Sequence, residues 1–175
     1  MRTVEHRRHG RRDPGAVHLS PEGLEKARSL ASTIGRFDRV VSSPVPRAVE
    51  TVEALGFSVD VTVPELALVP GEVDRFLELF RPQSYADFVR MVRRKRVVAE
   101  YARQMADLLR EELLRVPDEG RLLVVSHGGV IELGAAGARG QDALSFGPAA
   151  GYLEGVRLFL VGREWVRGEV VRVPT

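Results

Sequence analysis

Three short stretches of the sequence combine residues that bind anions with residues that can act as nucleophiles. They are "RRHGRRD" at 7–13, "SSPVPR" at 42–47 and "SHGG" at 126–129. The residues of interest within them are Arg8, His9, Gly10, Ser43, Arg47, His127 and Gly128. Guanidinium groups bind phosphoryl oxygens bidentately, and an imidazole can attack phosphorus. If the three stretches meet, the pocket they form suits a tetrahedral anion such as a phosphoryl group.

Of the two histidines, His9 is the better candidate for the nucleophile. The charge of Arg8 beside it discourages protonation of the imidazole, and a tight turn at Gly10 can leave a backbone carbonyl free to orient the ring. His127 can then donate a hydrogen bond to the oxygens whose charge increases during transfer. Because arginines supply the positive charge that magnesium supplies in other phosphoryl-transfer enzymes, we expect neither a metal nor another cofactor.

Alternating strands and helices must position these residues. Ser20 as N-cap, Pro21 at the first position and Gly35 as the stop predict a helix between them. The other predicted elements are strands at 37–43, 57–63 and 121–129, helices at 45–55, from 84 to 115 and after Gly129, and a closing hairpin at 156–173 that turns near Gly162. The segment at 64–83 is predicted as a loop.

Strands that alternate with helices favour a mostly parallel sheet that is covered on both faces. The predicted fold is therefore a three-layer α/β/α sandwich, with residues 1–175 forming a single domain. Ligands of such sheets bind outside the carboxyl ends of the strands, which is where all three stretches fall. This placement predicts that they converge on one site.

The composition excludes several classes of protein. The chain has no cysteine, which rules out disulfides and cysteine-ligated zinc or iron–sulfur sites. No apolar run approaches the length of a membrane span, so we expect a cytoplasmic protein with no membrane partner. The formal net charge is only +2, which does not indicate a nucleic-acid-binding protein.

One basic run, "RRKR" at 93–96, supports a different function. On a helix it can form a docking stripe for nucleic acid or for an acidic protein. Aromatic residues make up only 6% of the chain, however, and no motif for base stacking is visible. Since an arginine-rich helix face is most often simply solvated, we expect no nucleic-acid partner.

Four blocks, taken in order and spacing, resemble the histidine phosphatase superfamily, which has the phosphoglycerate mutase-like fold. The blocks are "RHG" at 8–10, "LSPEGLEKARSLA" at 19–31, "SSPVPRAVETVEAL" at 42–55 and "VVSHGGVIE" at 124–132. The resemblance implies that His9 is the phosphorylated nucleophile, that Arg8 and Arg47 clamp the phosphate, and that His127 is the second histidine of the pocket.

The chain departs from this family on both sides of the first block. Glu5, His6 and Arg7 precede it where apolar residues are usual, and Arg11 and Arg12 follow it where the mutases usually carry an acid and a small polar residue. Arg12 is expected to widen the positive mouth of the pocket. His6 and His18 match no block position with a role, so both are assigned to the surface or to a supporting position behind the site.

The resemblance implies a metal-independent phosphomonoesterase that works through a phosphohistidine. The substrate is left open between a phosphorylated small molecule and a phosphoprotein, and the oligomeric state is not indicated. Because the chain is short and carries Arg11 and Arg12, hydrolysis is favoured over a mutase-type phosphotransfer. Two alternatives are kept. One is a mutase-type phosphotransferase, and the other is a module without catalysis that binds phosphorylated ligands or nucleic acid.

The group that protonates the departing oxygen remains to be placed. In this superfamily it is usually a carboxyl group in the segment after the second strand, here "VPELALVPGEVDRF" at 63–76. Glu72 is favoured, because a turn at Pro70 and Gly71 can return the chain over the mouth of the pocket. Glu65 and Asp74 are the other candidates, and all three can also be ordinary carboxylates of a surface loop.

Overall fold

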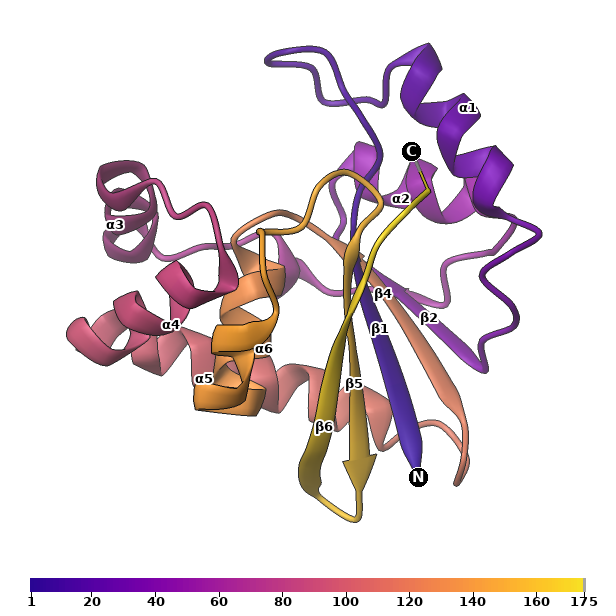
Figure 1. Cartoon of the computed structure of the whole chain (residues 1–175). Helices are drawn as coiled ribbons and strands as arrows, with labels where there is room; N and C mark the ends of the chain where they lie inside the picture. The colour runs from indigo at the N-terminus through magenta and orange to yellow at the C-terminus, as the bar shows by residue number, and fades with distance from the viewer. Residues whose placement is uncertain (175) are drawn as a thin grey trace.

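A six-stranded sheet lies at the centre of the computed structural model, which describes residues 1–174 (Figure 1). The strands are β1 (Arg2–Arg8), β2 (Arg39–Ser42), β3 (Val61–Thr62), β4 (Arg121–Ser126), β5 (Gly155–Val161) and β6 (Glu164–Val171). Their order is β3-β2-β4-β1-β5-β6, and the first four are mutually parallel. β5 and β6 form the antiparallel hairpin at the other edge. The predicted sheet and closing hairpin are confirmed.

Helices cover both faces of this sheet, which confirms the three-layer architecture (Figure 1). They are α1 (Pro21–Leu30), α2 (Pro46–Ala54), α3 (Gly71–Phe80), α4 (Tyr85–Arg94), α5 (Arg96–Leu113) and α6 (Val130–Arg139), with short 3-10 helices at Pro64–Leu66 and Gly140–Ser145. Alternate residues of β4 pack in opposite directions: Leu123 and Val125 against α2, and Leu122 and Val124 into the larger cluster that includes α5 and α6. None of the helices in the described part of the chain is both long and apolar enough to cross a bilayer.

Several boundaries differ from those predicted. The helix that begins at Pro21 ends at Leu30, before Gly35, and β3 has only two residues. The long helical region is two helices, because Lys95 adopts an extended conformation with φ −128° and ψ 111°. The predicted loop after β3 contains α3, in which Val73, Phe76 and Leu77 recur at helical spacing and pack against the core, a pattern that the sequence interpretation overlooked.

The strand that precedes the first block buries charged residues in place of apolar ones. Glu5, His6 and Arg7 are all at most 5% exposed. On the α1 and α2 face, the Glu5 carboxylate pairs with Arg7 at 2.5 Å and with Arg157 of β5 at 2.8 Å. On the opposite face, His6 Nε2 lies 2.6 Å from the hydroxyl of Ser126. Buried charged and polar groups need such partners, and here neighbouring strands supply them.

Candidate active site

The parallel order β2-β4-β1 brings the carboxyl ends of three strands together at one edge of the sheet. A cavity of about 340 Å³ opens there. Six residues that the sequence marked for binding or catalysis line it: Arg8, His9, Arg12, Arg47, His127 and Gly128. Ser43 and Gly10 do not line the cavity themselves. The Ser43 hydroxyl is hydrogen-bonded to His127, and the Gly10 carbonyl is hydrogen-bonded to His9. The convergence expected from the strand ends is therefore present.

Hydrogen bonds on both nitrogens determine the state of the His9 ring. Nδ1–H donates to the Gly10 carbonyl at 2.7 Å, and Nε2 accepts from Arg47 Nε at 3.1 Å. The Gly10 N–H in turn donates to the hydroxyl of Thr51 at 2.9 Å. Burial, and then the charges of Arg47, Arg8 and Arg12, lower the pKa of His9 to about 4. At neutral pH the ring is uncharged, with its Nε2 lone pair on the side of the arginines.

His127 faces His9 across the cavity, with the ring centroids 5.3 Å apart. Its Nε2 lies 2.8 Å from the Ser43 hydroxyl, and its Nδ1 lies 3.4 Å from a terminal nitrogen of Arg47. Burial lowers the pKa of His127 to about 3, with further contributions from His9 and from the arginines. A bound anion would oppose the effect of the arginines and favour the protonated ring.

The arginines are held by backbone contacts that leave donors for a ligand. Arg8 donates from one terminal nitrogen to the Ala150 carbonyl at 3.0 Å, and its buried Nε has no protein partner. Arg47 lies in the first turn of α2, as expected, and Arg12 donates to the Ala16 carbonyl at 2.9 Å. Three guanidinium groups, two from the stretch 7–13 and one from α2, thus lie around the two imidazoles. The arrangement suits a phosphoryl dianion.

Gly128 lets the Arg8 guanidinium approach the backbone closely. A Cβ atom at position 128 would lie 3.2 Å from Arg8 Cζ and 3.3 Å from Nε. We expect Gly128→Ala to displace Arg8 and weaken competitive inhibition by inorganic phosphate about tenfold, the equivalent of one charge-assisted hydrogen bond. The matched control is Gly71→Ala, where an added Cβ meets nothing within 4 Å. Equal phosphate inhibition constants in the two variants would contradict this role.

The acid predicted from the sequence is not at this site. Glu72 is exposed in the first turn of α3 and lines a separate surface hollow with Arg94, Lys95 and Arg96. Glu65 and Asp74 are also exposed. The expected turn at Pro70 and Gly71 is the start of α3, and the cavity is lined after that helix by Pro82, not by Glu72. The geometry therefore gives Glu72 no contact with the cavity.

Sequence reasoning missed Glu132, the one carboxyl group that lines the cavity among residues 1–174. It is 1% exposed, and its two oxygens accept the N–H groups of Gly129 at 2.6 Å and Ala150 at 2.8 Å. Burial raises the pKa of Glu132. Glu132 stands three residues after Gly129, at the position where a glutamate caps the start of a helix. That spacing was the signal in the sequence that could have placed its carboxyl group near the site. Through Ala150, Glu132 supports the carbonyl to which Arg8 donates.

The other two histidines have different surroundings. His6 is fully buried behind the site. Of the two positions predicted for it, the supporting position is therefore correct and the surface position is wrong. His18 is exposed and pairs with Glu50. The basic run 93–96 spans the junction of α4 and α5, where Arg96 pairs with Glu100 at 2.8 Å. No cluster of three or more His, Asp or Glu side chains that could hold a metal ion occurs in residues 1–174.

Comparisons with known proteins bear on the fold and on the first part of the sequence. Residues 2–68 match the model of the histidine phosphatase superfamily (branch 1). No curated protein sequence matches the chain. Several solved structures do, all at low identity, so their likeness establishes the fold alone.

Three of these structures are similar over nearly the whole chain. A phosphoserine phosphatase from Entamoeba histolytica, in complex with 3-phosphoglyceric acid, has 19% identity and a TM-score of 0.69, covering 95% of this chain and 94% of that one. A mycobacterial glucosyl-3-phosphoglycerate phosphatase has 20% identity and a TM-score of 0.66, covering 98% of both chains. A phosphoglycerate mutase from Bacillus anthracis has 14% identity and a TM-score of 0.62, covering 94% and 90%. The chain thus has the phosphoglycerate mutase-like fold, and its residues 2–68 carry the sequence pattern of the histidine phosphatase superfamily.

Proposed function

We propose that the protein is a metal-independent phosphomonoesterase that works through a phosphohistidine on His9. The observation that carries the proposal is the state of the His9 ring. Its Nδ1–H is held by Gly10, and its Nε2 lone pair lies among the guanidinium groups that would bind the phosphoryl oxygens. A neutral, oriented imidazole beside an anion site is what nucleophilic attack on phosphorus requires.

In the proposed first step the phosphoryl group binds Arg8, Arg12 and Arg47 and displaces the contact between Arg47 and His9. His9 Nε2 then attacks phosphorus, the P–N bond forms, and the P–O bond to the leaving group breaks. The electron pair of that bond departs with the leaving oxygen. The charge of the bound dianion favours protonated His127, which donates a hydrogen bond to a phosphoryl oxygen as charge develops.

In the second step water attacks the phosphohistidine. The P–N bond breaks, the electron pair returns to His9 Nε2, and inorganic phosphate leaves with the oxygen of the water molecule. Phosphorylated small molecules are the substrates that the names of the phosphoserine and glucosyl-3-phosphoglycerate phosphatases give for those proteins. Those names support a small phosphomonoester for this chain, and the similarity to the protein histidine phosphatase SixA keeps a phosphoprotein as the alternative.

The test is hydrolysis of 4-nitrophenyl phosphate in excess EDTA, combined with acid-stopped labelling by a ³²P-phosphomonoester. We expect steady turnover that the chelator does not change, and a phosphoenzyme that decays rapidly in buffer. A stable phosphoenzyme that transfers its phosphoryl group between phosphoglycerates, dependent on a bisphosphate primer, would identify a mutase instead. Tight phosphate binding without any turnover would identify a binding module.

A further inference from the structure

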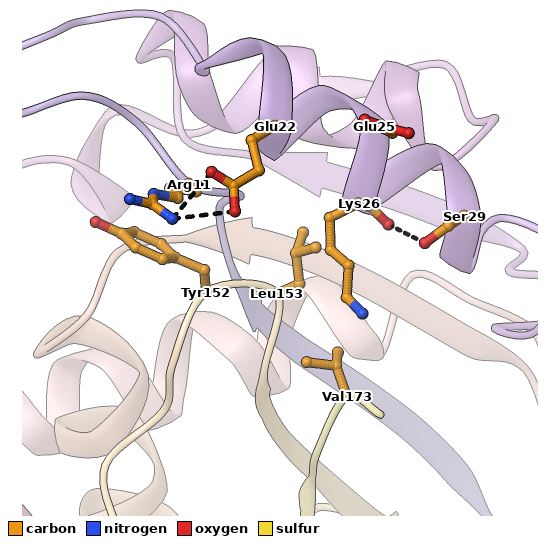
Figure 2. A pocket seen from close by; sticks show the side chains of 8 residues that line it. All are labelled: Arg11, Glu22, Glu25, Lys26, Ser29, Tyr152, Leu153 and Val173. Atoms are coloured by element: carbon orange, nitrogen blue, oxygen red, sulfur yellow. Dashed lines mark hydrogen bonds and ion pairs between the residues drawn. The ribbon is translucent and has the colours of Figure 1, made fainter. Parts of the chain in front are cut away.

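A second hollow lies beside the proposed phosphate pocket, between α1 and the segment that leads into β5 (Figure 2). We call it the α1 groove. Its volume is about 520 Å³. The residues that line its floor are Tyr152, Leu153 and Val173, and those along its rim are Arg11, Glu22, Glu25, Lys26 and Ser29. None of these residues has a role in the steps proposed above.

The α1 groove combines an apolar floor with a rim whose charges cancel. Leu153, Val173 and the ring of Tyr152 form the floor. On the rim, Arg11 and Glu22 pair with each other at 2.9 Å, and Glu25 and Lys26 add one further charge of each sign. A groove of this kind favours an uncharged apolar body, because a charged group would lose hydration on the floor without gaining a net opposite charge.

Tyr152 connects the α1 groove with the proposed catalytic residues. Its ring centroid lies 5.8 Å from that of His9, and the Arg8 guanidinium lies 4.6 Å from the same ring. Figure 2 shows Tyr152 and Arg11 side by side at one end of the groove. The Tyr152 ring therefore lines the groove and also lies next to His9 and Arg8.

The position of Tyr152 is held by the backbone that follows it. The Leu153 N–H donates to the Arg8 carbonyl at 3.1 Å, and the Leu153 carbonyl accepts from the buried Arg7 at 2.8 Å. Leu153 adopts a φ of +65°, a conformation that L residues with side chains rarely take. Such contacts keep the segment, and the ring beside His9, in a defined place.

We propose that the α1 groove receives the leaving group of the substrate, and that this group is an uncharged aromatic alcohol. The proposal rests on the phosphatase function proposed above and names its substrate class. An aryl ester also fits the chemistry of the pocket. The lining carboxyl of Glu132 has both oxygens engaged by N–H groups, and a phenolate leaves phosphorus without first being protonated. It then takes its proton from water.

The experiment compares kcat/KM for 2-naphthyl phosphate and phenyl phosphate. For the wild-type protein we expect about a tenfold preference for the naphthyl ester, expressed mainly in KM, as burial of a second ring implies. Ser29→Trp fills the groove from an exposed position whose hydroxyl bonds only to Lys26 of the same helix. It should remove that preference and leave kcat for phenyl phosphate unchanged.

Arg28→Trp is the matched control, since Arg28 is exposed on the same helix and does not line the groove. It should keep the full preference. Equal kcat/KM for the two esters in the wild-type protein, or an unchanged preference in Ser29→Trp, would overturn the proposal while the phosphatase function stands.

Binding of 2-naphthol, followed by its fluorescence, tests the groove without any turnover. We expect about tenfold weaker binding to Ser29→Trp than to the wild-type protein and to Arg28→Trp. If neither ester is hydrolysed but this difference in binding is present, the phosphatase function fails and the groove remains a site for aromatic alcohols. Equal binding to all three proteins would overturn the groove assignment.

Discussion

Replacement of His9 by alanine is expected to lower kcat for 4-nitrophenyl phosphate by about a thousandfold or more, because the proposed covalent route passes through its ring. The folded state should persist. His9 is buried and uncharged at neutral pH, and its removal leaves the three arginines with a water-accessible cavity. The measurement combines kcat with the thermal midpoint and with ³²P labelling of the acid-stopped protein. His9→Ala should give no labelled phosphoenzyme.

His18→Ala is the control for this result. His18 has an exposed ring and pairs with Glu50 outside the cavity, so its loss should change kcat less than about twofold. If His9→Ala keeps activity comparable to that of His18→Ala, the nucleophile is another group. The phosphohistidine mechanism would then be abandoned.

Glu5→Gln should strongly destabilise the folded protein, although the residue lies outside the catalytic pocket. The Glu5 side chain is 1% exposed and accepts from Arg7, whose side chain is 6% exposed, and from Arg157. Loss of its charge leaves the Arg7 guanidinium buried without a counter-ion, which costs about 3–5 kcal/mol in the free energy of unfolding. Urea unfolding, followed by circular dichroism, measures this difference.

Glu169→Gln provides the comparison for Glu5→Gln. Glu169 also pairs with Arg157, but its side chain is 37% exposed, so its loss should cost less than about 1 kcal/mol. Similar destabilisation by the two substitutions would show that the buried network around Glu5 contributes no more than a surface ion pair. Arg7 also holds the Leu153 carbonyl, so Glu5→Gln should loosen the segment that carries Tyr152.

The candidate site was largely predictable because its main residues follow directly from strand ends. In a parallel sheet the carboxyl ends of adjacent strands share one edge, so His9 and His127 had to approach each other once their strands were assigned. Arg47 followed from its place in the first turn of the next helix. These are local patterns joined by one general rule of topology, and that rule holds here.

The parts that were not predicted depend on contacts between distant segments. Tyr152 reaches His9 only because β5 pairs with β1, a contact between residues about 150 positions apart that no local pattern reveals. The same holds for Glu5, whose charge was unexpected in a first strand until Arg157 appeared opposite it. Glu72 was misplaced because Pro70 and Gly71 were taken as a turn, although they begin α3.

The position of β1 in the sheet has a consequence for the order in which the protein can be completed during synthesis. β1 leaves the ribosome first, yet its two neighbours are β4 and β5, with Thr3 opposite Arg121 and Arg2 opposite Leu160. The strand that leads to His9 therefore has no partner strand until β4 and β5 have been synthesised. An apolar strand exposed for that time would promote aggregation. The charges of Glu5, Arg7 and Arg8 favour hydration of the unpaired strand, and the strand that carries the nucleophile is complete in the sheet only once β4 and β5 have paired with it.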